Sequence, residues 1–200
     1  MSALYFDILK DRLYTFSAWS KGRRSAQTAL CDILSSLATL MAPILSFTAE
    51  EVWKHIPGSN RTESVFFASF PESRSDYLDE ALHEKWERIW EVRMTVTKAL
   101  EEARKNRTIG HSLDAQVHLH LPEKLYTLLQ PYEADLKSIF IVSSVVLSPA
   151  VPGTDDEKEM RVEVRRAEGK KCERCWNYDT KVGLHPQHQT LCGRCVEAIH

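Results

Sequence analysis

Four of the five cysteines in this chain stand in two pairs near its end, Cys172-x-x-Cys175 and, after sixteen intervening residues, Cys192-x-x-Cys195. A two-residue gap lets both thiolates of a pair reach one ion from a tight turn, and two such turns complete a tetrahedron. This is the spacing of a zinc ribbon. Because all four ligands are cysteines, no position is left for water. We therefore predict one structural Zn²⁺ per chain.

Other readings of the cysteines are weaker. Disulfides or simple burial do not explain the paired spacing, and clustered cysteines in a reducing compartment are typical of metal ligands. His185 and His188 lie between the two pairs as competing ligands, but four thiolates already fill the shell. Cys31 lies in an apolar helical stretch and is expected to be a small core residue.

Composition limits the possible partners. Hydrophobic residues make up 43% and charged residues 27% of the 200 residues, which is usual for a globular domain. The net charge is -2, from 26 basic and 28 acidic side chains, so a nucleic-acid surface has to be local. No apolar run is long enough to span a membrane, and the charged start does not resemble a secretion signal. We expect a cytoplasmic monomer with no membrane partner.

The first half of the chain predicts a helical bundle over residues 1–110. Apolar residues recur at three- and four-residue spacing in each expected helix. Thr48 and Glu51 form a capping-box pattern that predicts the start of the third helix. The expected helices cover residues 3–16, 25–41, a short stretch from 48, and 77–107.

The periodicity changes after Gly110. Residues 115–121 alternate between apolar and polar, which predicts a strand with one buried face, and the Val- and Ile-rich stretch 139–147 predicts another. Short helices are expected between them. We therefore expect a small α/β subdomain over 111–150, a linker over 151–160 and a four-cysteine zinc-binding domain over 161–200, in which 161–166 alternates like a strand.

Cations and aromatic rings surround the first cysteine pair. Residues 161–200 hold eight basic and five acidic side chains, and four thiolates with Zn²⁺ reduce this balance of +3 to about +1. Lys170, Lys171 and Arg174 bracket Cys172, and Trp176 follows the pair. Unpaired bases stack on aromatic rings while cations meet phosphates, so this corner suits single-stranded nucleic acid. Packing of Trp176 over the zinc turn is an equally open alternative.

Other candidate sites are less specific. His118 and His120 stand two apart on one strand face, a spacing that suits a metal, but no third ligand is evident and a solvated face is favoured. Arg23 and Arg24 precede a helix where they would reach phosphate, although surface solubility is the default explanation for them. The chain has no phosphate-binding glycine loop and no set of residues that predicts a catalytic nucleophile.

Several motifs resemble bacterial isoleucyl-tRNA synthetases. They are YFDILKDRLYT (5–15), RRSAQTAL (23–30), LMAPILSFTAEEVW (40–53), FPES (70–73), KCERCWNY (171–178) and LCGRC (191–195). The third is shared among class I synthetases for several amino acids, whereas CERCW with a second CxxC is more specific. The resemblance covers essentially the whole chain.

The resemblance implies a mainly α fold: a class I synthetase anticodon-binding helix bundle, a small α/β unit and a terminal four-cysteine zinc ribbon. It implies that the chain binds the anticodon stem-loop of the isoleucine tRNA, with Cys172, Cys175, Cys192 and Cys195 holding zinc. Arg23, Arg24, Arg174 and Trp176 match motif positions near the expected RNA face. The ATP-dependent catalytic domain, with its HIGH and KMSKS signatures, and the editing domain are absent, so this chain alone is not expected to be catalytic.

Two other classes of function stay open. A similar four-cysteine finger ends one class of DNA glycosylases, but those enzymes need an amino-terminal catalytic residue, and Met1-Ser2-Ala3 does not suggest one. The zinc finger of another class I synthetase is a related possibility. A further alternative is a zinc-ribbon interaction module with no nucleic-acid partner.

Overall fold

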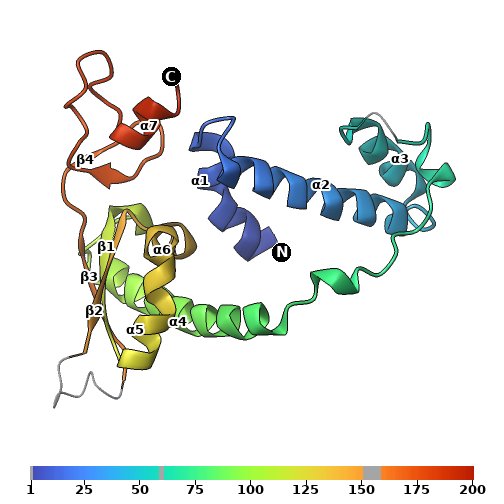
Figure 1. Cartoon of the computed structure of the whole chain (residues 1–200). Coiled ribbons are helices and arrows are strands. Elements are labelled where there is room, and N and C mark those ends of the chain that lie inside the picture. The colour runs from blue at the N-terminus through green and yellow to red at the C-terminus, as the bar shows by residue number, and fades with distance from the viewer. Residues whose placement is uncertain (1, 59–60, 151–158) are drawn as a thin grey trace. The chain divides into compact units, whose positions relative to one another are not determined.

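The computed structural model describes residues 2–58, 61–150 and 159–200. The chain divides into two compact units, Met1–Ser17 with Asp79–His200, and Ala18–Leu78 (Figure 1). Most of the linker expected over 151–160 lies outside the described residues. The boundaries expected at 110, 150 and 160 stay predictions. No helix among the described residues is long and apolar enough to cross a membrane.

The smaller unit is helical. Helix α2 (Lys21–Met41) begins at Ser20, whose hydroxyl accepts the backbone N–H of Arg23 at 3.3 Å. Helix α3 (Ser46–His55) follows, and two 3-10 turns cover Val65–Phe67 and Ser75–Tyr77. The apolar sides of these elements meet in a small core of Ala38, Ala42, Ala49, Trp53, Ile56 and Val65.

The predicted capping box at Thr48 is wrong. Helix α3 starts two residues earlier, at Ser46, and no side chain caps it. The reason lies in the preceding turn, where the N–H of Leu45 donates to the carbonyl of Met41 at 2.8 Å. This bond turns the chain directly after α2, so α3 begins as soon as the turn closes.

The larger unit contains the sheet and the cysteine pairs. It starts with a π-helical turn (Ser2–Phe6) and α1 (Asp7–Thr15), and it resumes with α4 (Glu80–Lys105), which the Asp79 side chain caps by accepting the N–H of Leu82 at 2.9 Å. The remaining elements are, in order, a 3-10 turn (Ser112–Asp114), β1 (Ala115–Leu121), α5 (Glu123–Leu129), a 3-10 turn (Gln130–Tyr132), α6 (Glu133–Phe140), β2 (Ser144–Pro149), β3 (Arg161–Arg166), β4 (Lys170–Lys171), β5 (Tyr178–Asp179) and α7 (Gly193–Glu197).

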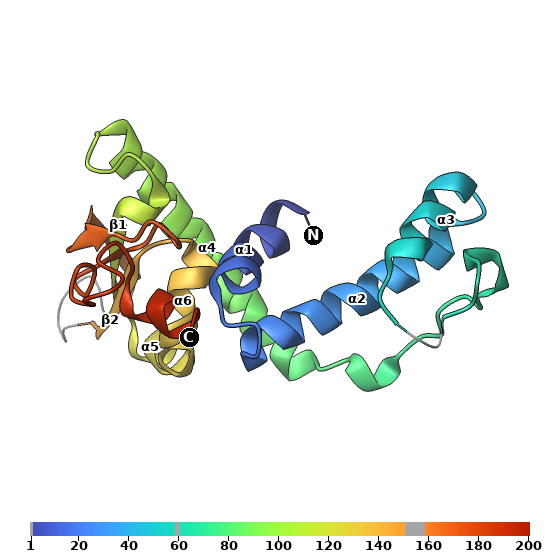
Figure 2. The same cartoon turned by 90° about the horizontal axis from the view of Figure 1, so that it is seen from above.

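Strand β1 is the centre of a three-stranded sheet with the order β2-β1-β3. It pairs parallel to β2 and antiparallel to β3. The parallel pair needs a crossover, which α5 and α6 supply. The inward side chains of β1 are fully buried and pack with α4, α5 and α6, which cover the sheet (Figure 2). That inward set is Ala115, Val117, Leu119 and Leu121.

The predicted strand over 139–147 is partly wrong. Residues 139 and 140 form the last turn of α6, and β2 begins only at Ser144. Ile139 and Phe140 are apolar because they enter the core from a helix, and Ile141 ends that helix in a left-handed conformation with φ 58°. A short Val- and Ile-rich run does not by itself distinguish a strand from a buried helix end. The mainly α class is confirmed.

We expect Leu119→Ala to lower the free energy of unfolding of the larger unit by about 2–5 kcal/mol, because Leu119 is fully buried and the change leaves a cavity. Hydrogen exchange of the β1 amides measures this loss. The matched variant Leu184→Ala removes a leucine that is 75% exposed, and it is expected to change the same amides by less than about 0.5 kcal/mol. Equal effects of the two variants would contradict this account of the core.

Candidate metal centre and nucleic-acid interface

The four cysteines converge at the end of the larger unit. Their sulfur atoms all lie within 4.8 Å of one another, and all four residues are buried. The first pair follows β4 in a hairpin with β5, and the second pair flanks the start of α7. Figure 1 shows these elements gathered at one end of the unit.

Local backbone geometry makes this hairpin tight. The N–H of Cys172 donates to the carbonyl of Asn177 at 2.9 Å, and the N–H of Trp176 donates to the carbonyl of Cys172 at 2.8 Å. Trp176 adopts a left-handed φ of 65°. Gly169 has φ +88°, and a Cβ there would lie 2.4 Å from the backbone of Asp179. The close approach of the two strands therefore requires glycine at this position.

The sulfur geometry fits zinc. A tetrahedral ion with Zn–S bonds of about 2.3 Å places its sulfurs roughly 3.8 Å apart. The Sγ atoms of Cys175 and Cys192 are 3.7 Å apart. With four thiolates and no ligand position left for water, the centre is a structural zinc site.

Protonation of these sulfurs is coupled to metal binding. Without a metal, the hydrogen bond from Cys192 lowers the pKa of Cys175 to about 4, and the same contact with burial raises the pKa of Cys192. Burial raises the pKa of Cys195 to about 11. Only part of the group is ionised in this state, so zinc binding has to displace the remaining protons.

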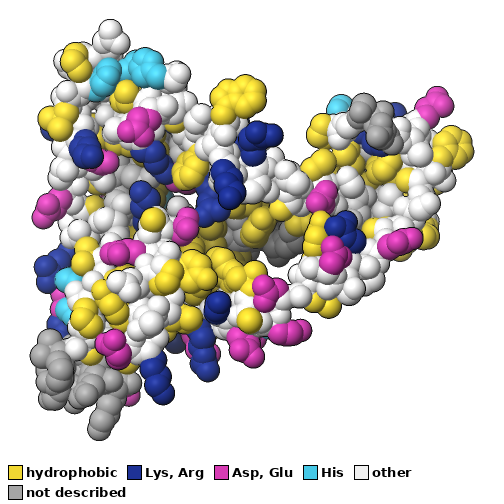
Figure 3. Space-filling model, viewed as in Figure 1, with side chains coloured by type: hydrophobic (Ala, Val, Ile, Leu, Met, Phe, Trp, Pro, Cys, Tyr) yellow, Lys and Arg dark blue, Asp and Glu magenta, His cyan; other side chains and the backbone are white. Residues whose placement is uncertain are grey.

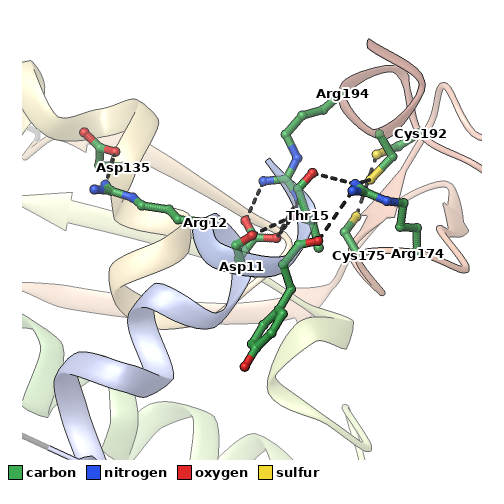
Figure 4. Close-up of polar contacts among 10 residues, drawn as sticks. Asp11, Arg12, Thr15, Asp135, Arg174, Cys175, Cys192 and Arg194 are labelled. Carbon is green, nitrogen blue, oxygen red and sulfur yellow. Dashed lines mark hydrogen bonds and ion pairs between the residues drawn. The ribbon is translucent and has the colours of Figure 1, made fainter. Parts of the chain in front are cut away.

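Two arginines join the cysteine unit to α1 (Figure 4). The Arg194 guanidinium donates to both carboxylate oxygens of Asp11, at 2.5 and 2.8 Å. Arg174 donates to the carbonyl of Thr15 at 2.5 Å and to the Sγ of Cys195 at 3.6 Å. Arg174 therefore fixes the cysteine hairpin to the carboxyl end of α1, where cations interact favourably with the helix dipole, and Arg194 fixes α7 to the same helix.

The half-buried carboxylate of Asp11 is held in its charged form. Burial opposes its ionisation, but hydrogen bonds from Arg194 and Thr15 outweigh that cost and lower the pKa of Asp11. Burial likewise disfavours the charge on Arg194, yet the contact with Asp11 prevails and raises its pKa. This bidentate pair is a geometrically specific attachment between α1 and α7.

A second attachment joins the hairpin to the sheet. The N–H of Tyr178 donates to the Ser143 hydroxyl at 2.7 Å, and that hydroxyl donates to the carbonyl of Leu113 at 2.5 Å. Ser143 is buried, so both bonds lie away from solvent. The cysteine hairpin is thus held by contacts with α1 on one side and with the sheet on the other.

A recess of about 490 Å³ lies between these attachments. Its walls come from α1, from 111–113, from the end of α6 and from 174–177, and they include Lys10, Tyr14, Lys137 and Trp176. The Trp176 side chain is 58% exposed, and the Nζ of Lys171 lies 5.2 Å from its ring centroid. A flat ring with nearby cations can stack on a base while the cations meet phosphate.

The four predicted RNA contacts fall in two places. Trp176 and Arg174 lie together beside the zinc centre, but Arg174 uses its donors on backbone carbonyls and a thiolate. Arg23, half-buried, and Arg24, exposed, lie in the first turn of α2 in the smaller unit. All four stay predictions as RNA contacts. His185 and His188 stack on each other, with ring centroids 5.3 Å apart.

Sequence reasoning missed the partnership of Arg194 with Asp11. The two residues are 183 positions apart, and only the placement of an arginine inside the second cysteine pair hinted at a role. It also missed Glu163, which lies close enough to His118 and His120 to share a metal ion with them.

Zinc removal from the full chain should unfold mainly the cysteine unit, because no other contact holds its four buried sulfurs together as a bound ion does. Hydrogen exchange after chelation is expected to show lost protection at residues 170–179 and 191–197 and weaker protection at the end of α1. The β1 amides serve as the internal control and should keep theirs. Unchanged protection around the cysteines would contradict a structural metal.

Asp11→Asn is expected to lower the free energy of unfolding by about 1.5–3 kcal/mol, because it removes a charged, bidentate partner of Arg194. The pKa of Asp11 is lowered in the folded state. Its contribution to the free energy of unfolding is therefore fully present above the unfolded-state pKa of about 3.9, and it is lost as the pH falls through the folded-state pKa. Urea unfolding of both proteins at several pH values measures this difference.

Asp7→Asn is the matched control for that experiment. Asp7 pairs with Lys10 on the exposed side of α1, so its loss is expected to cost less than about 1 kcal/mol. A difference between wild type and Asp11→Asn that grew on acidification would refute the assigned role of Asp11.

Comparison with known proteins agrees with this geometry. The chain is 45% identical over 207 aligned residues to an isoleucine–tRNA ligase of Caldanaerobacter subterraneus subsp. tengcongensis, and 48% identical over 203 to one of Geobacter sulfurreducens. Each alignment covers 100% of this chain but only 22% of the relative. Residues 169–198 match the model of a zinc finger found in FPG and IleRS. Residues 1–119 match the anticodon-binding domain of tRNA ligase, and the chain belongs to that family.

Proposed function

We propose that this chain is the tRNA-binding portion of an isoleucine–tRNA ligase and that it recognises the anticodon stem-loop of the isoleucine tRNA. The observation that carries the proposal is the order of the two matched domains, anticodon-binding at 1–119 and zinc finger at 169–198, within a similarity that spans the chain. The whole protein would join isoleucine to tRNA with ATP, through catalytic and editing domains outside these residues. The chain would act as a cytoplasmic monomer.

The zinc unit supports a direct part in RNA binding. Trp176 presents an exposed ring beside Lys171, at the mouth of a recess whose walls also carry Lys10 and Lys137. An unpaired anticodon base would stack on the indole while its phosphates meet the lysines. Arg174 would act as a positioning residue, since its donors fix the hairpin that carries Trp176, and Arg194 would hold the neighbouring helix α7 in place.

The smaller unit would supply further phosphate contacts. Arg23 and Arg24 lie in the first turn of α2, where the helix dipole also favours an anion. Such contacts fix the register of the RNA without reading its sequence. We assign base recognition to the zinc unit and backbone contact to α2.

Titration of the chain with the isoleucine tRNA, and with a transcript altered in the anticodon, tests the proposal. Binding should weaken as salt rises, because phosphate contacts release counterions, and it should weaken when the anticodon changes. Trp176→Ala is expected to cost about 1–3 kcal/mol, the usual contribution of one stacked base. Lys171→Glu should also reduce, by about 1, the slope of the logarithm of the binding constant against the logarithm of the salt concentration.

Lys85→Glu is the matched control for Lys171→Glu. Lys85 is exposed on α4, and its substitution changes the charge by the same amount. Equal affinity for both transcripts would overturn anticodon recognition. Preserved tRNA binding in a Lys170→Glu, Lys171→Glu, Arg174→Glu variant would favour an interaction module in which the zinc unit meets protein. Excision of damaged bases from duplex DNA would point to the glycosylase class.

A further inference from the structure

Three potential metal ligands lie together on the outer face of the sheet. Because Val117 and Leu119 point into the core, the alternation of β1 places His118 and His120 on the opposite side. The antiparallel register sets Glu163 of β3 directly across from His118. Neighbours across paired strands share one face, so all three side chains meet.

Their geometry is close to that of a coordination shell. One ligand atom from each residue lies within 4.8 Å of the others, and the Nε2 of His120 is 3.8 Å from a carboxylate oxygen of Glu163. The two imidazole rings stack with centroids 4.6 Å apart. The Nε2 of His120 is buried and lacks a hydrogen-bond partner, which is costly for a polar atom.

We propose that His118, His120 and Glu163 form a binding site for a divalent transition-metal ion, separate from the four-cysteine centre. Two imidazoles and a carboxylate are ligands that Zn²⁺ and its neighbours accept, and three protein ligands leave one position open to solvent. The metal would satisfy the orphaned nitrogen of His120. The side chains of His120 and Glu163 keep 23% and 24% of their surface exposed, so the ligand cluster lies close to solvent.

Surrounding groups orient these ligands. The Nε2 of His118 lies 2.8 Å from the Ser148 hydroxyl on β2, which fixes the ring. Burial, together with the neighbouring His120 ring, lowers the pKa of His118 and favours the neutral form that binds metals. Arg165 donates to one oxygen of Glu163 at 2.7 Å and orients the carboxylate from outside the shell.

One contact opposes the ion. Arg161 ion-pairs with the same Glu163 oxygen that faces His120, so it would compete with a metal ion for that oxygen. Its side chain is 57% exposed and can move into solvent. The site therefore predicts competition: removal of Arg161 should strengthen metal binding, whereas removal of any ligand should weaken it. A purely structural ion-pair network would not bind metal more tightly after the removal of Arg161.

Figure 3 shows histidine side chains also gathered over the zinc-binding unit. There the rings of His185 and His188 stack, and His200 lies tilted against both, with ring centroids 5.3 to 6.3 Å apart. This second histidine group is the natural competitor for added metal. It supplies the matched control variant, His188→Gln, which changes one imidazole and leaves the sheet untouched.

The test uses the full chain with one zinc already held by its cysteines, titrated with further Zn²⁺ by calorimetry. We expect a second equivalent to bind to wild type and to His188→Gln alike. His118→Gln, His120→Gln and Glu163→Gln should each weaken it by at least about tenfold, since even residues outside a metal's ligand shell commonly matter that much. Arg161→Gln should tighten it. Absence of a second equivalent, or one unaffected by the three ligand variants, overturns the proposal.

A measurement on the wild-type chain guards against variants that fail to fold. Paramagnetic Ni²⁺ added to the zinc-loaded chain should broaden the amide signals of residues 117–121 and 162–164 first. Broadening centred on 185–188 instead would place the metal at the other histidine group and reject the sheet site. Because neither readout involves tRNA, the outcome is independent of the proposed function.

Discussion

The attraction between one divalent cation and four buried thiolates is the interaction on which the end of this chain depends. Strands β4 and β5 contain two residues each and α7 only five, so the apolar surface that they bury is too small to hold them together. The ion makes this segment a folded unit. Once folded, the segment presents Arg174 and Arg194 to α1 and a backbone N–H to Ser143, and through these contacts it joins the core of the larger unit.

Local sequence patterns predicted the features that depend on residues close together in the chain. The cysteine spacing, the alternation of β1 and the apolar periodicity of α2 and α4 each correspond to an observed element. The errors lie at element ends: the turn after α2 displaces the start of α3, and the last turn of α6 looks like a strand in its sequence. Pairing of β3 with β1 and of Arg194 with Asp11 joins residues far apart in the chain, and no local pattern specifies such partners.

The two matched domains differ in how their residues are used. Residues 1–119, which match the anticodon-binding domain, are mainly a scaffold of helices. The proposed recognition of bases depends instead on a few side chains beside the zinc centre. This division follows from chemistry. Helices present charge to phosphates over a broad area, but distinguishing one base from another needs a rigid ring and donors held at fixed positions. A metal-fixed turn provides such rigidity with very few residues.

The left-handed backbone at Trp176 has a thermodynamic consequence. A non-glycine residue adopts φ 65° at a conformational cost, and here the hairpin bond from its N–H to the carbonyl of Cys172 enforces that conformation. The backbone that carries the indole is therefore fixed when the chain folds, before any ligand arrives. A nucleotide stacked on the ring, as proposed, would meet a backbone already in place, so its binding would require no rearrangement of the protein backbone.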